Sequence, residues 1–571
     1  MSFTDHLPPE MLSRGRLYQQ RILALLIVLV SLAFFLPGFS SLQPMDRDEP
    51  RFAQATKQML ETDDYIAIRF QTEARNKKPV GIYWMQAAVV SAAEAVGISE
   101  ARTKIWLYRI PSLLGAIATV LLTWWGARAL MSEGYALIAS MLVASTILLG
   151  VEARLAKTDA VVTATVVAAM GVLARIWMKR GKDALQGLDV WKLAFVFWFA
   201  LGIGILVKGP ITPLVPLFAS IALAIYARSA GWLNALKPLV GILLCVAIVA
   251  PWFYLIMKAT QGAFLQDSLG ADMMSKVQSG QEAHGAPPGT YLAAFFATAW
   301  PMSPLAVLAI PFAWKMRRDP TVAFLLAWIV PVWLMFEAVP TKLPHYVLPT
   351  YPAIAMLTAY ALEKNALALN GRLRHVLWLV PGIAVVLTLV GLIGPFVLHA
   401  PAAAMFYLVA PFVLWQAWRM SVAIRRREEG RLVPGGAVLA FFSYVMVYGG
   451  VLGGPVFATY GLSPRLAEAR REATTATQGC FDLAPVTTRY REPSLVFLTR
   501  TDLAMQDGAG AAKFMAEDKC RIAFIASQDE PAFEQALGDA AAKIVLRTRL
   551  QGVNLNGGRK LDIGVYVRGA Q

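Results

Sequence analysis

The chain has few charged residues and very few cysteines for its length. Asp, Glu, Lys and Arg make up 16% of its 571 residues, whereas 57% are hydrophobic, and the mean hydropathy is +0.53. Soluble domains rarely reach such values, so the composition indicates a polytopic membrane protein. Three cysteines exclude a disulfide-rich scaffold. The sequence also lacks internal repeats and low-complexity segments.

The net charge of +16 does not indicate a nucleic-acid-binding protein. The basic residues stand in short clusters between apolar segments, as they do in the cytoplasmic loops of membrane proteins. The first apolar segment, residues 22–39, lacks a small-residue cleavage site. We therefore expect a retained first membrane helix rather than a cleaved signal peptide.

Long apolar segments predict about thirteen transmembrane helices, since a membrane helix needs about 20 apolar residues. Segment 82–97 is shorter and contains Glu94, so its place is open from length alone. The predicted spans are 20–38, 106–128, 134–150, 159–178, 190–207, 210–227, 238–258, 291–313, 320–337, 346–362, 375–397, 402–420 and 436–457.

Basic clusters decide the orientation. Arg14, Arg16 and Arg21 precede the first span, which predicts a cytoplasmic N-terminus. If segment 82–97 crossed the bilayer, all later basic clusters would lie outside; if it lies in the interface, all lie inside. We therefore predict a re-entrant or surface helix there. The polar loops then share the outer face, namely 39–105, 150–158, 208–210, 259–290 and 338–345.

The last part of the chain has the composition of a soluble domain. We divide the chain into a transmembrane domain, 1–458, and a small α/β domain, 459–571, which an odd number of spans places outside. The pattern predicts strands at 494–499, 521–526, 543–548 and 561–567 and helices at 464–475, 508–518 and 531–542. Cys480 and Cys520 are either a disulfide or two free thiols, and Cys245 is expected to be a core residue.

A polar stretch directly after the first span contains Asp48-Glu49-Pro50-Arg51. Proline is tolerated only in the first turn of a helix, so the stretch predicts a helix start. The two carboxylates either cap this helix or serve a site. Apolar residues recur at helical spacing and predict a helix with one side on the bilayer; they are Phe52, Met59 and Leu60.

Cations on the predicted outer face point to an anionic ligand. Arg and Lys give charge-assisted hydrogen bonds to phosphate, and at the membrane surface the phosphate can belong to a lipid. Each single cation can instead be a snorkelling residue at a helix end. The cations are Arg51, Lys77, Lys78, Arg154, Lys157, Lys208 and Lys342.

Histidines on the same face raise the question of a metal. Glu282 with His284 is a candidate metal pair, and His345 can join it, but without regular spacing the pattern is weak. His284 can equally be a loop residue that makes local hydrogen bonds. A divalent cation that bridges phosphate and carboxylates is therefore possible, and no cofactor is certain.

Several ordered motifs lie within about residues 10–360. They begin at Asp48, Lys77, Arg109, Arg154, Leu206, His284 and Lys342. Together these motifs resemble the polyprenyl-phosphate-dependent glycosyltransferases related to the 4-amino-4-deoxy-L-arabinose lipid A transferase and to protein O-mannosyltransferases. The resemblance implies a C-type glycosyltransferase fold, a donor sugar on undecaprenyl phosphate, and transfer at the periplasmic face of the bacterial inner membrane. Lipid A or another envelope glycan is the implied acceptor.

The resemblance also suggests roles for single residues. Asp48 matches the carboxylate at the reaction centre, and Asp159 is a second carboxylate. Glu49, the neighbour of Asp48, is a further catalytic candidate, and Asp46 is an alternative for part of the role of Asp48. The expected ligands of the carrier phosphate are Arg51, Lys78, Lys208, Lys342 and Tyr346. The expected substrate pocket contains Tyr83, Arg154, Glu282, His284 and His345.

Other functions stay open at this point. The same chemistry can serve a uronic acid, mannose or another hexose, or a protein or polysaccharide acceptor. A transporter of lipid-linked sugars is a different class, and it predicts charged residues along a path through the membrane. Here the charges gather at one face, which favours the transferase.

Overall fold

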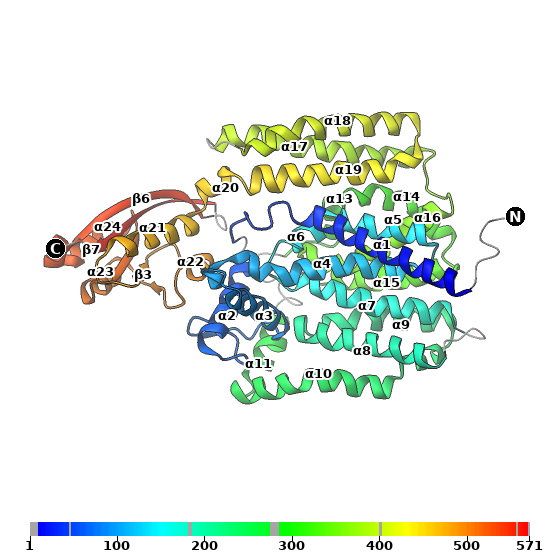
Figure 1. Ribbon diagram of the computed structural model, residues 1–571, viewed down its shortest axis with the longest axis horizontal. Coiled ribbons are helices and arrows are strands. Elements are labelled where there is room, and N and C mark those ends of the chain that lie inside the picture. The colour runs from blue at the N-terminus through cyan, green and yellow to red at the C-terminus, as the bar shows by residue number, and fades with distance from the viewer. Residues whose placement is uncertain are drawn as a thin grey trace.

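The computed structural model describes residues 9–44, 47–180, 186–273, 285–398, 402–554 and 558–568. A bundle of long helices carries a smaller domain with a mixed β-sheet at one end (Figure 1). The N-terminus lies at the other end of the bundle. The prediction of a helical, multi-pass membrane protein with a C-terminal α/β domain is confirmed.

Eight helical segments among the described residues are long and apolar enough to cross a membrane. They are Tyr18–Phe35, Ile105–Ala127, Asp159–Met178, Leu188–Lys208, Pro238–Ala259, Pro320–Ala338, Arg372–Val397 and Glu429–Leu452. They correspond to α1 (Pro9–Phe35), α4, α7, α8, α10, α15, the region of α17 (Leu379–Leu398) and the region of α19 (Leu432–Tyr444). By length and composition the structure thus supports fewer spans than the thirteen predicted.

Five further helices account for the difference, four of them shorter than 18 residues and α18 with 23. Three apolar ones are α5 (Glu133–Ala144), α9 (Ile211–Ala227) and α14 (Met302–Lys315), and α16 (Tyr351–Glu363) and α18 (Ala404–Arg426) lie in two other predicted spans. Two predicted spans were wrong as single helices. Segment 134–150 is α5 followed by α6 (Ile147–Glu152), and segment 291–313 is α13 (Thr290–Thr298) followed by α14. Pro301 lies in the second gap, where its missing N–H cannot continue a helix.

Two short helices, α2 (Asp48–Thr62) and α3 (Gly81–Ala95), lie at the end of the bundle beside the C-terminal domain (Figure 1). The short strands β1 (Arg69–Phe70) and β2 (Glu73–Ala74) lie between them in the chain. The predicted helix start at Asp48 is confirmed. The expectation that the apolar side of α2 rests on the bilayer was wrong, since Phe52, Met59 and Leu60 are buried inside the protein.

The C-terminal domain has a five-stranded sheet in the order β4-β3-β5-β7-β6. Strand β3 runs parallel to β4 and β5, whereas β7 runs antiparallel to β5 and β6. The strands are β3 (Ala484–Thr487), β4 (Ala504–Met505), β5 (Arg521–Ala526), β6 (Ile544–Asn554) and β7 (Arg559–Arg568). The helices are α20 (Pro455–Tyr460), α21 (Leu462–Ala476), α22 (Pro493–Leu498), α23 (Gly508–Glu517) and α24 (Glu530–Leu537).

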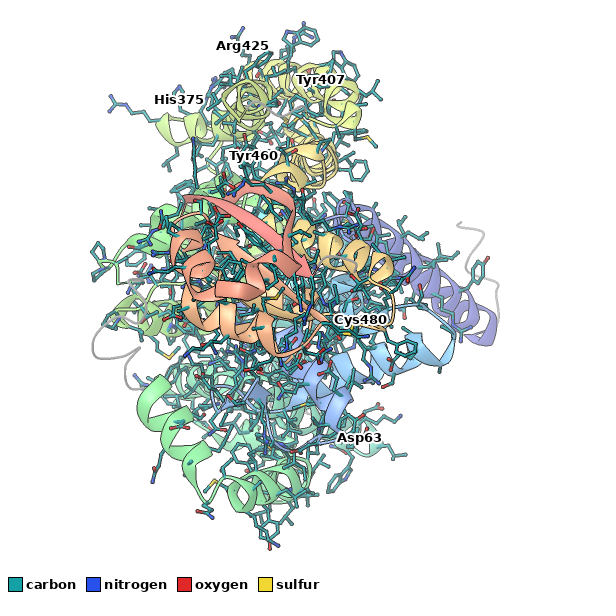
Figure 2. All side chains as sticks on the ribbon, turned by 90° about the vertical axis from the view of Figure 1, so that its left-hand side faces the viewer. Asp63, His375, Tyr407, Arg425, Tyr460 and Cys480 are labelled. Atoms are coloured by element: carbon teal, nitrogen blue, oxygen red, sulfur yellow. A yellow bond between two sulfur atoms is a disulfide. The ribbon has the colours of Figure 1, made fainter. Side chains whose placement is uncertain are left out.

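Cys480 and Cys520 form a disulfide with their Cα atoms 5.5 Å apart. Figure 2 views the molecule with the C-terminal domain toward the reader and labels Cys480. The bond joins the segment after α21 to the start of β5. Of the two alternatives left open by the sequence, the structure has the disulfide.

The predicted strand at 494–499 was wrong, because this segment is the helix α22. Pro493 stands in its first turn, where proline suits a helix. Three consecutive apolar residues, Leu495 to Phe497, are all buried. A strand places alternate side chains on opposite faces. The sequence pattern did not reveal that other parts of the protein cover both sides of α22.

Helix α22 packs against α2 and thereby joins the two ends of the chain. The Lys57 ammonium donates to the carbonyl oxygen of Phe497 at 3.0 Å, and the Phe497 ring contacts Tyr108 edge to face at 5.2 Å. Gln71 Nε2 donates to the carbonyl oxygens of Thr501 and Leu503 at 3.0 and 2.9 Å. The C-terminal domain therefore helps to hold the first loop.

Candidate active site

Asp159 begins α7 and lies buried at the end of the bundle near α2 and α3. Helix α4 fixes this position, because a Cβ atom added at Gly115 would lie 2.8 Å from the backbone nitrogen of Val161. The Ser112 hydroxyl also donates to the carbonyl oxygen of Lys157 at 2.9 Å. The close approach of α4 thus sets the turn before α7 and the direction of the Asp159 carboxylate.

Lys208 is the last residue of α8 and donates a hydrogen bond to the Asp159 carboxylate. The helix ends there because Gly209 has a φ of +72°, which glycine adopts without strain. The Lys208 ammonium also lies 5.6 Å from the centre of the Tyr346 ring. A Cβ atom at Gly81 would lie 2.8 Å from the carbonyl oxygen of Leu206, so the start of α3 touches the last turn of α8.

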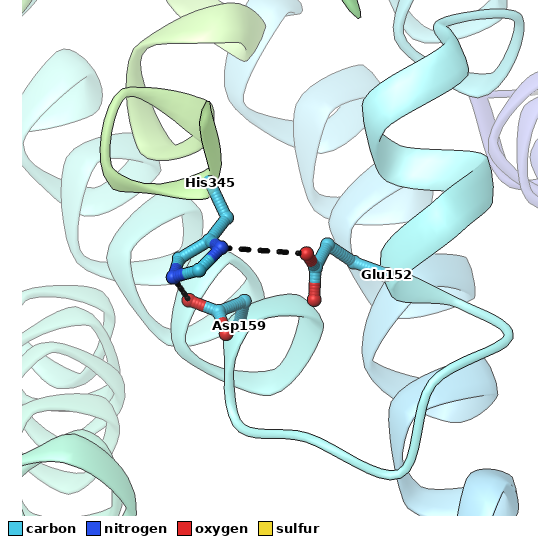
Figure 3. Close-up of side chains that lie close together, drawn as sticks. All are labelled: Glu152, Asp159 and His345. Atoms are coloured by element: carbon cyan, nitrogen blue, oxygen red, sulfur yellow. Dashed lines mark ion pairs between the residues drawn. The ribbon is translucent and has the colours of Figure 1, made fainter. Parts of the chain in front are cut away.

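His345 lies between two carboxylates (Figure 3). Its Nδ1 is 3.7 Å from Glu152 Oε1, and its Nε2 is 3.8 Å from Asp159 Oδ1. The residue belongs to the 3₁₀ turn η6 (Pro344–Tyr346). We call Glu152, Asp159, Lys208 and His345 the α7 cluster. Glu152 was not among the predicted site residues. Its position in the same polar turn as Asp159 was the available indication in the sequence.

The surroundings of His345 keep its ring neutral. Burial lowers the pKa of His345 well below its ordinary value, and the Asp159 carboxylate opposes this effect. The positive charges of Lys157, Lys208 and Lys78 lower the same pKa further. These three lysines, which are far apart in the sequence, therefore act on the same imidazole ring. A neutral imidazole has one N–H donor and one acceptor nitrogen for a ligand.

Glu152, Asp159 and His345 form the group that can hold a metal ion among the described residues, since their ligand atoms lie within 4.8 Å of one another. Lys208 already contacts Asp159 Oδ1, so a metal ion would have to displace the Lys208 ammonium or share the Asp159 carboxylate with it. The predicted metal pair, Glu282 and His284, lies outside the described residues. So does Asp46.

Asp48 belongs to a second polar group, at the start of α2. Its carboxylate is half exposed and lies 3.9 Å from the Arg75 guanidinium. Arg75 stacks on Phe52 at 5.0 Å, and Phe52 contacts the Tyr83 ring at 5.4 Å. Within the described part of the chain, the buried Tyr83 hydroxyl and Arg75 Nε have no hydrogen-bond partner. The N-cap of α2 is Arg47, and Asp48 and Glu49 both stand in the first turn, near the positive end of the helix dipole.

Glu49 lies next to Asp48 in sequence but has different surroundings. It is fully buried, and Arg109 donates to its two oxygens at 2.7 and 3.0 Å. The backbone N–H of Ala156 donates to the same carboxylate at 3.0 Å. We call this pair the Arg109 clamp. The other N–H groups of Arg109 donate to the carbonyl oxygens of Phe39, Leu42 and Gln43.

Two further predicted cations are anchored to backbone carbonyls. Arg154 donates to the carbonyl oxygens of Phe34, Pro37 and Gly150 and stacks on Tyr448. The Lys342 ammonium donates to those of Phe336, Glu337 and Val339, near the end of α15. The structure therefore uses both side chains to hold helix ends. Arg51 lies in α2, one turn after Asp48, and has no ion pair with another described residue.

Comparisons with known proteins point in one direction. Residues 77–255 match the family described as dolichyl-phosphate-mannose-protein mannosyltransferase. The undecaprenyl phosphate-alpha-4-amino-4-deoxy-L-arabinose arabinosyl transferase of Erwinia tasmaniensis is 26% identical over 398 residues, which are 67% of this chain and 69% of that protein. A second transferase of the same description, from Pseudomonas fluorescens, is 27% identical over 65% of both chains. The chain thus matches about two thirds of the length of these relatives.

A solved structure has the same fold. ArnT from Cupriavidus metallidurans, in the crystal structure bound to undecaprenyl phosphate, superimposes with a TM-score of 0.70 at 18% sequence identity. The superposition covers 95% of this chain and 97% of that one. The apo structure of the same protein gives the same TM-score.

Proposed function

We propose that the chain is a polyprenyl-phosphate-dependent glycosyltransferase that moves a sugar from an undecaprenyl-phosphate carrier to lipid A. An aminoarabinose-type sugar is the first candidate, because the curated relatives quoted above carry that activity. Their identity of 26 to 27% leaves another sugar, or a protein or polysaccharide acceptor, as the alternative.

We also propose the finer topology. The eight long helices, the helix pairs α5–α6 and α13–α14, the helices α9 and α18, and the segment 346–362 that contains α16 together make thirteen crossings of the bacterial inner membrane. Helices α2 and α3 and the domain 459–571 then lie on the periplasmic side. The Cys480–Cys520 disulfide supports this placement, since disulfides persist in oxidising compartments.

The observation that carries the proposal is the contact between Lys208 and Asp159 beside His345 and Tyr346. Transfer from a glycosyl phosphate requires both anionic and cationic groups in the site. Positive charge develops on the sugar, and negative charge develops on the leaving phosphate. In the proposed site the ammonium groups of Lys208 and Lys78 bind the carrier phosphate, and Asp159 faces the sugar. Arg51 and Tyr346 are further candidates for the phosphate.

The reaction is a substitution at the anomeric carbon. An acceptor oxygen forms the new C–O bond while the bond from that carbon to the phosphate oxygen breaks, and its electron pair leaves with the phosphate. If the acceptor is a sugar hydroxyl, its proton passes to the Asp48 carboxylate. If it is a lipid A phosphate, which is already ionised, no base is needed, and Asp48 orients the acceptor. Arg75 Nε and the Tyr83 hydroxyl offer donors beside it.

The direct test is mass spectrometry of lipid A and of total envelope glycans from cells with and without the gene, and from cells with Asp48→Asn. We expect a defined sugar to disappear from lipid A in both mutants. Asp63→Asn is the matched control, because Asp63 lies exposed at the other end of α2 in a left-handed conformation that Asn tolerates. A change in another glycan would move the acceptor, and no change in any glycan would contradict the transferase.

An assay in detergent separates transferase from transporter. Purified protein with a polyprenyl-phosphate sugar and lipid A should form product without a sealed membrane. A transporter of lipid-linked sugars would need two compartments and would show no turnover there.

A further inference from the structure

The end of α7, the start of α8 and the end of α9 lie at the end of the bundle that carries the N-terminus (Figure 1). There the last turn of α7, the start of α8, the end of α9 and the 3₁₀ turn η3 (Gly231–Leu236) line a cavity of about 760 Å³. Pockets of about 300–1,000 Å³ are typical for small-molecule ligands. Helix α7 has 20 residues, so this cavity lies roughly 30 Å from Asp159.

The lining has one sign of charge. Lys179, Arg180 and Lys237 line the cavity, and among the described lining residues there is no carboxylate. Aromatic rings hold two of these cations. The Arg180 guanidinium stacks at 3.6 Å from the centre of the Trp177 ring, and the Lys237 ammonium lies 5.4 Å from that of Trp191. Such fixed cations are suited to bind a phosphate ester.

An unpaired hydrogen-bond donor in the lining also favours a phosphate ligand. The indole N–H of Trp232, a lining residue, is buried and has no acceptor among the residues that the structure describes. Two neighbouring tryptophans differ, since Trp177 donates to the carbonyl oxygen of Pro320 at 2.9 Å and Trp198 to that of Leu236 at 2.8 Å. Leaving a buried donor unpaired costs about 1–3 kcal/mol, which a ligand oxygen would offset.

We infer that this cavity binds the phosphate head group of an anionic membrane lipid. Its place at the ends of membrane-length helices puts it at the level of lipid head groups, where basic pockets between helices bind such lipids. The exposed side chains of Leu188 and Trp191 at the start of α8 offer apolar surface for the acyl chains. A soluble phosphate ester has the same head-group chemistry but does not use this apolar surface. The inference does not depend on the proposed function.

Native mass spectrometry of the purified full chain tests the assignment. The protein is offered equal amounts of phosphatidylglycerol and phosphatidylethanolamine, and we expect it to retain phosphatidylglycerol preferentially. The triple variant Lys179→Gln, Arg180→Gln, Lys237→Gln should retain at least about tenfold less. Trp232→Phe keeps an aromatic side chain, removes the indole N–H and should retain a few-fold less of the lipid.

A matched control removes three cations elsewhere. Lys315→Gln, Arg317→Gln, Arg318→Gln changes the end of α14 and the residues after it by the same charge, and one of its cations also stacks on a tryptophan. This variant should retain the lipid as the parent chain does. Equal losses in both triple variants would show general charge attraction and overturn the inference.

A second arm distinguishes the source of the phosphate. Glycerol 3-phosphate, added to lipid-free protein, should bind far more weakly than phosphatidylglycerol. Equally tight binding would assign the cavity to soluble phosphate esters and overturn the lipid. If the triple variant fails to fold, Trp232→Phe decides alone, because unchanged lipid retention in that variant contradicts a role for the unpaired donor.

Discussion

The Arg109 clamp and the α7 cluster are both buried ionic groups, yet they use their hydrogen bonds differently. In the clamp all five N–H groups of Arg109 have acceptors within 3.0 Å. In the α7 cluster, His345 lies 3.7 and 3.8 Å from its two carboxylates, beyond hydrogen-bond distance. The contrast teaches that burial of a charge alone does not mark a catalytic residue. In the proposed mechanism, the group that acts on the substrate is the one that keeps hydrogen-bonding capacity for a ligand.

The largest expected effect tests the cluster side of this comparison. Asp159→Asn removes the negative charge beside the sugar, and transfer per folded molecule should fall at least about 10³-fold, in addition to any stability lost when the buried pair with Lys208 is broken. Product formation from a polyprenyl-phosphate sugar measures the loss, with Asp63→Asn as the control. Retained activity would remove Asp159 from the proposed mechanism.

Glu49→Gln tests the clamp side. It leaves Arg109 buried without its counter-ion, so the protein should lose about 3–5 kcal/mol of stability, measured by denaturant titration. Activity per folded molecule should change only a few-fold. A stable but inactive Glu49→Gln protein would instead support the role in catalysis that the sequence suggested for Glu49.

Two lysines sharpen the comparison within one residue type. Lys208→Gln should reduce transfer per folded molecule about 10²-fold, because this ammonium is proposed to bind the leaving phosphate. Lys342→Gln should instead cost about 1–3 kcal/mol of stability, because three carbonyl oxygens lose their donor. The transfer rate and the unfolding free energy of both variants are measured in parallel. If the assignment is wrong, Lys208→Gln would mainly lower stability and Lys342→Gln would mainly lower transfer.

A third buried cation, Lys57, gives a pH-dependent effect. Burial lowers the pKa of Lys57 to about 8, and Glu61 only partly opposes it. The unfolded or undocked chain keeps the ordinary lysine pKa of about 10.5, so between these values it binds more protons than the folded chain. The contact between α2 and α22 should therefore gain about 1–2 kcal/mol as pH rises from 8 to 9.5.

Hydrogen exchange of residues 493–503, corrected for the intrinsic pH dependence, measures this change. Lys57→Met should abolish it. An equal gain in the Met variant would assign the effect to another group.

The smallest expected effect concerns metal. Lys208 already supplies positive charge at Asp159, so chelation with EDTA should change transfer by less than about twofold. Loss of activity on chelation, restored by a divalent cation, would favour a metal at Glu152, Asp159 and His345.

Single residues explain how much the sequence could predict. Asp159, Lys208 and His345 stand out as ionisable residues in apolar surroundings, so their type pointed to a site. Glu152 was missed because its partner, His345, lies far away in the chain, and no spacing rule joins them. Glu49 was assigned to catalysis because sequence does not reveal that Arg109 uses both of its oxygens.

Secondary structure follows the same logic. Long helices such as α7 and α8 were found because their apolar length is a local property. The helix α22 was predicted as a strand because its form depends on α2 and Tyr108, which cover it from far away in sequence. The apolar side of α2 was placed on the bilayer for the same reason.

The contact between Lys57 and Phe497 joins residues 440 positions apart and has a consequence for the making of the protein. At about 5–20 residues per second, a ribosome needs roughly 20–90 s to reach the second residue after the first. During this time the α2 helix lacks the cover of α22, so Lys57 and its apolar neighbours stay accessible to proteases and chaperones. A truncated chain that ends before α22 therefore leaves the surface of α2, the helix that contains Asp48, exposed to proteases and chaperones.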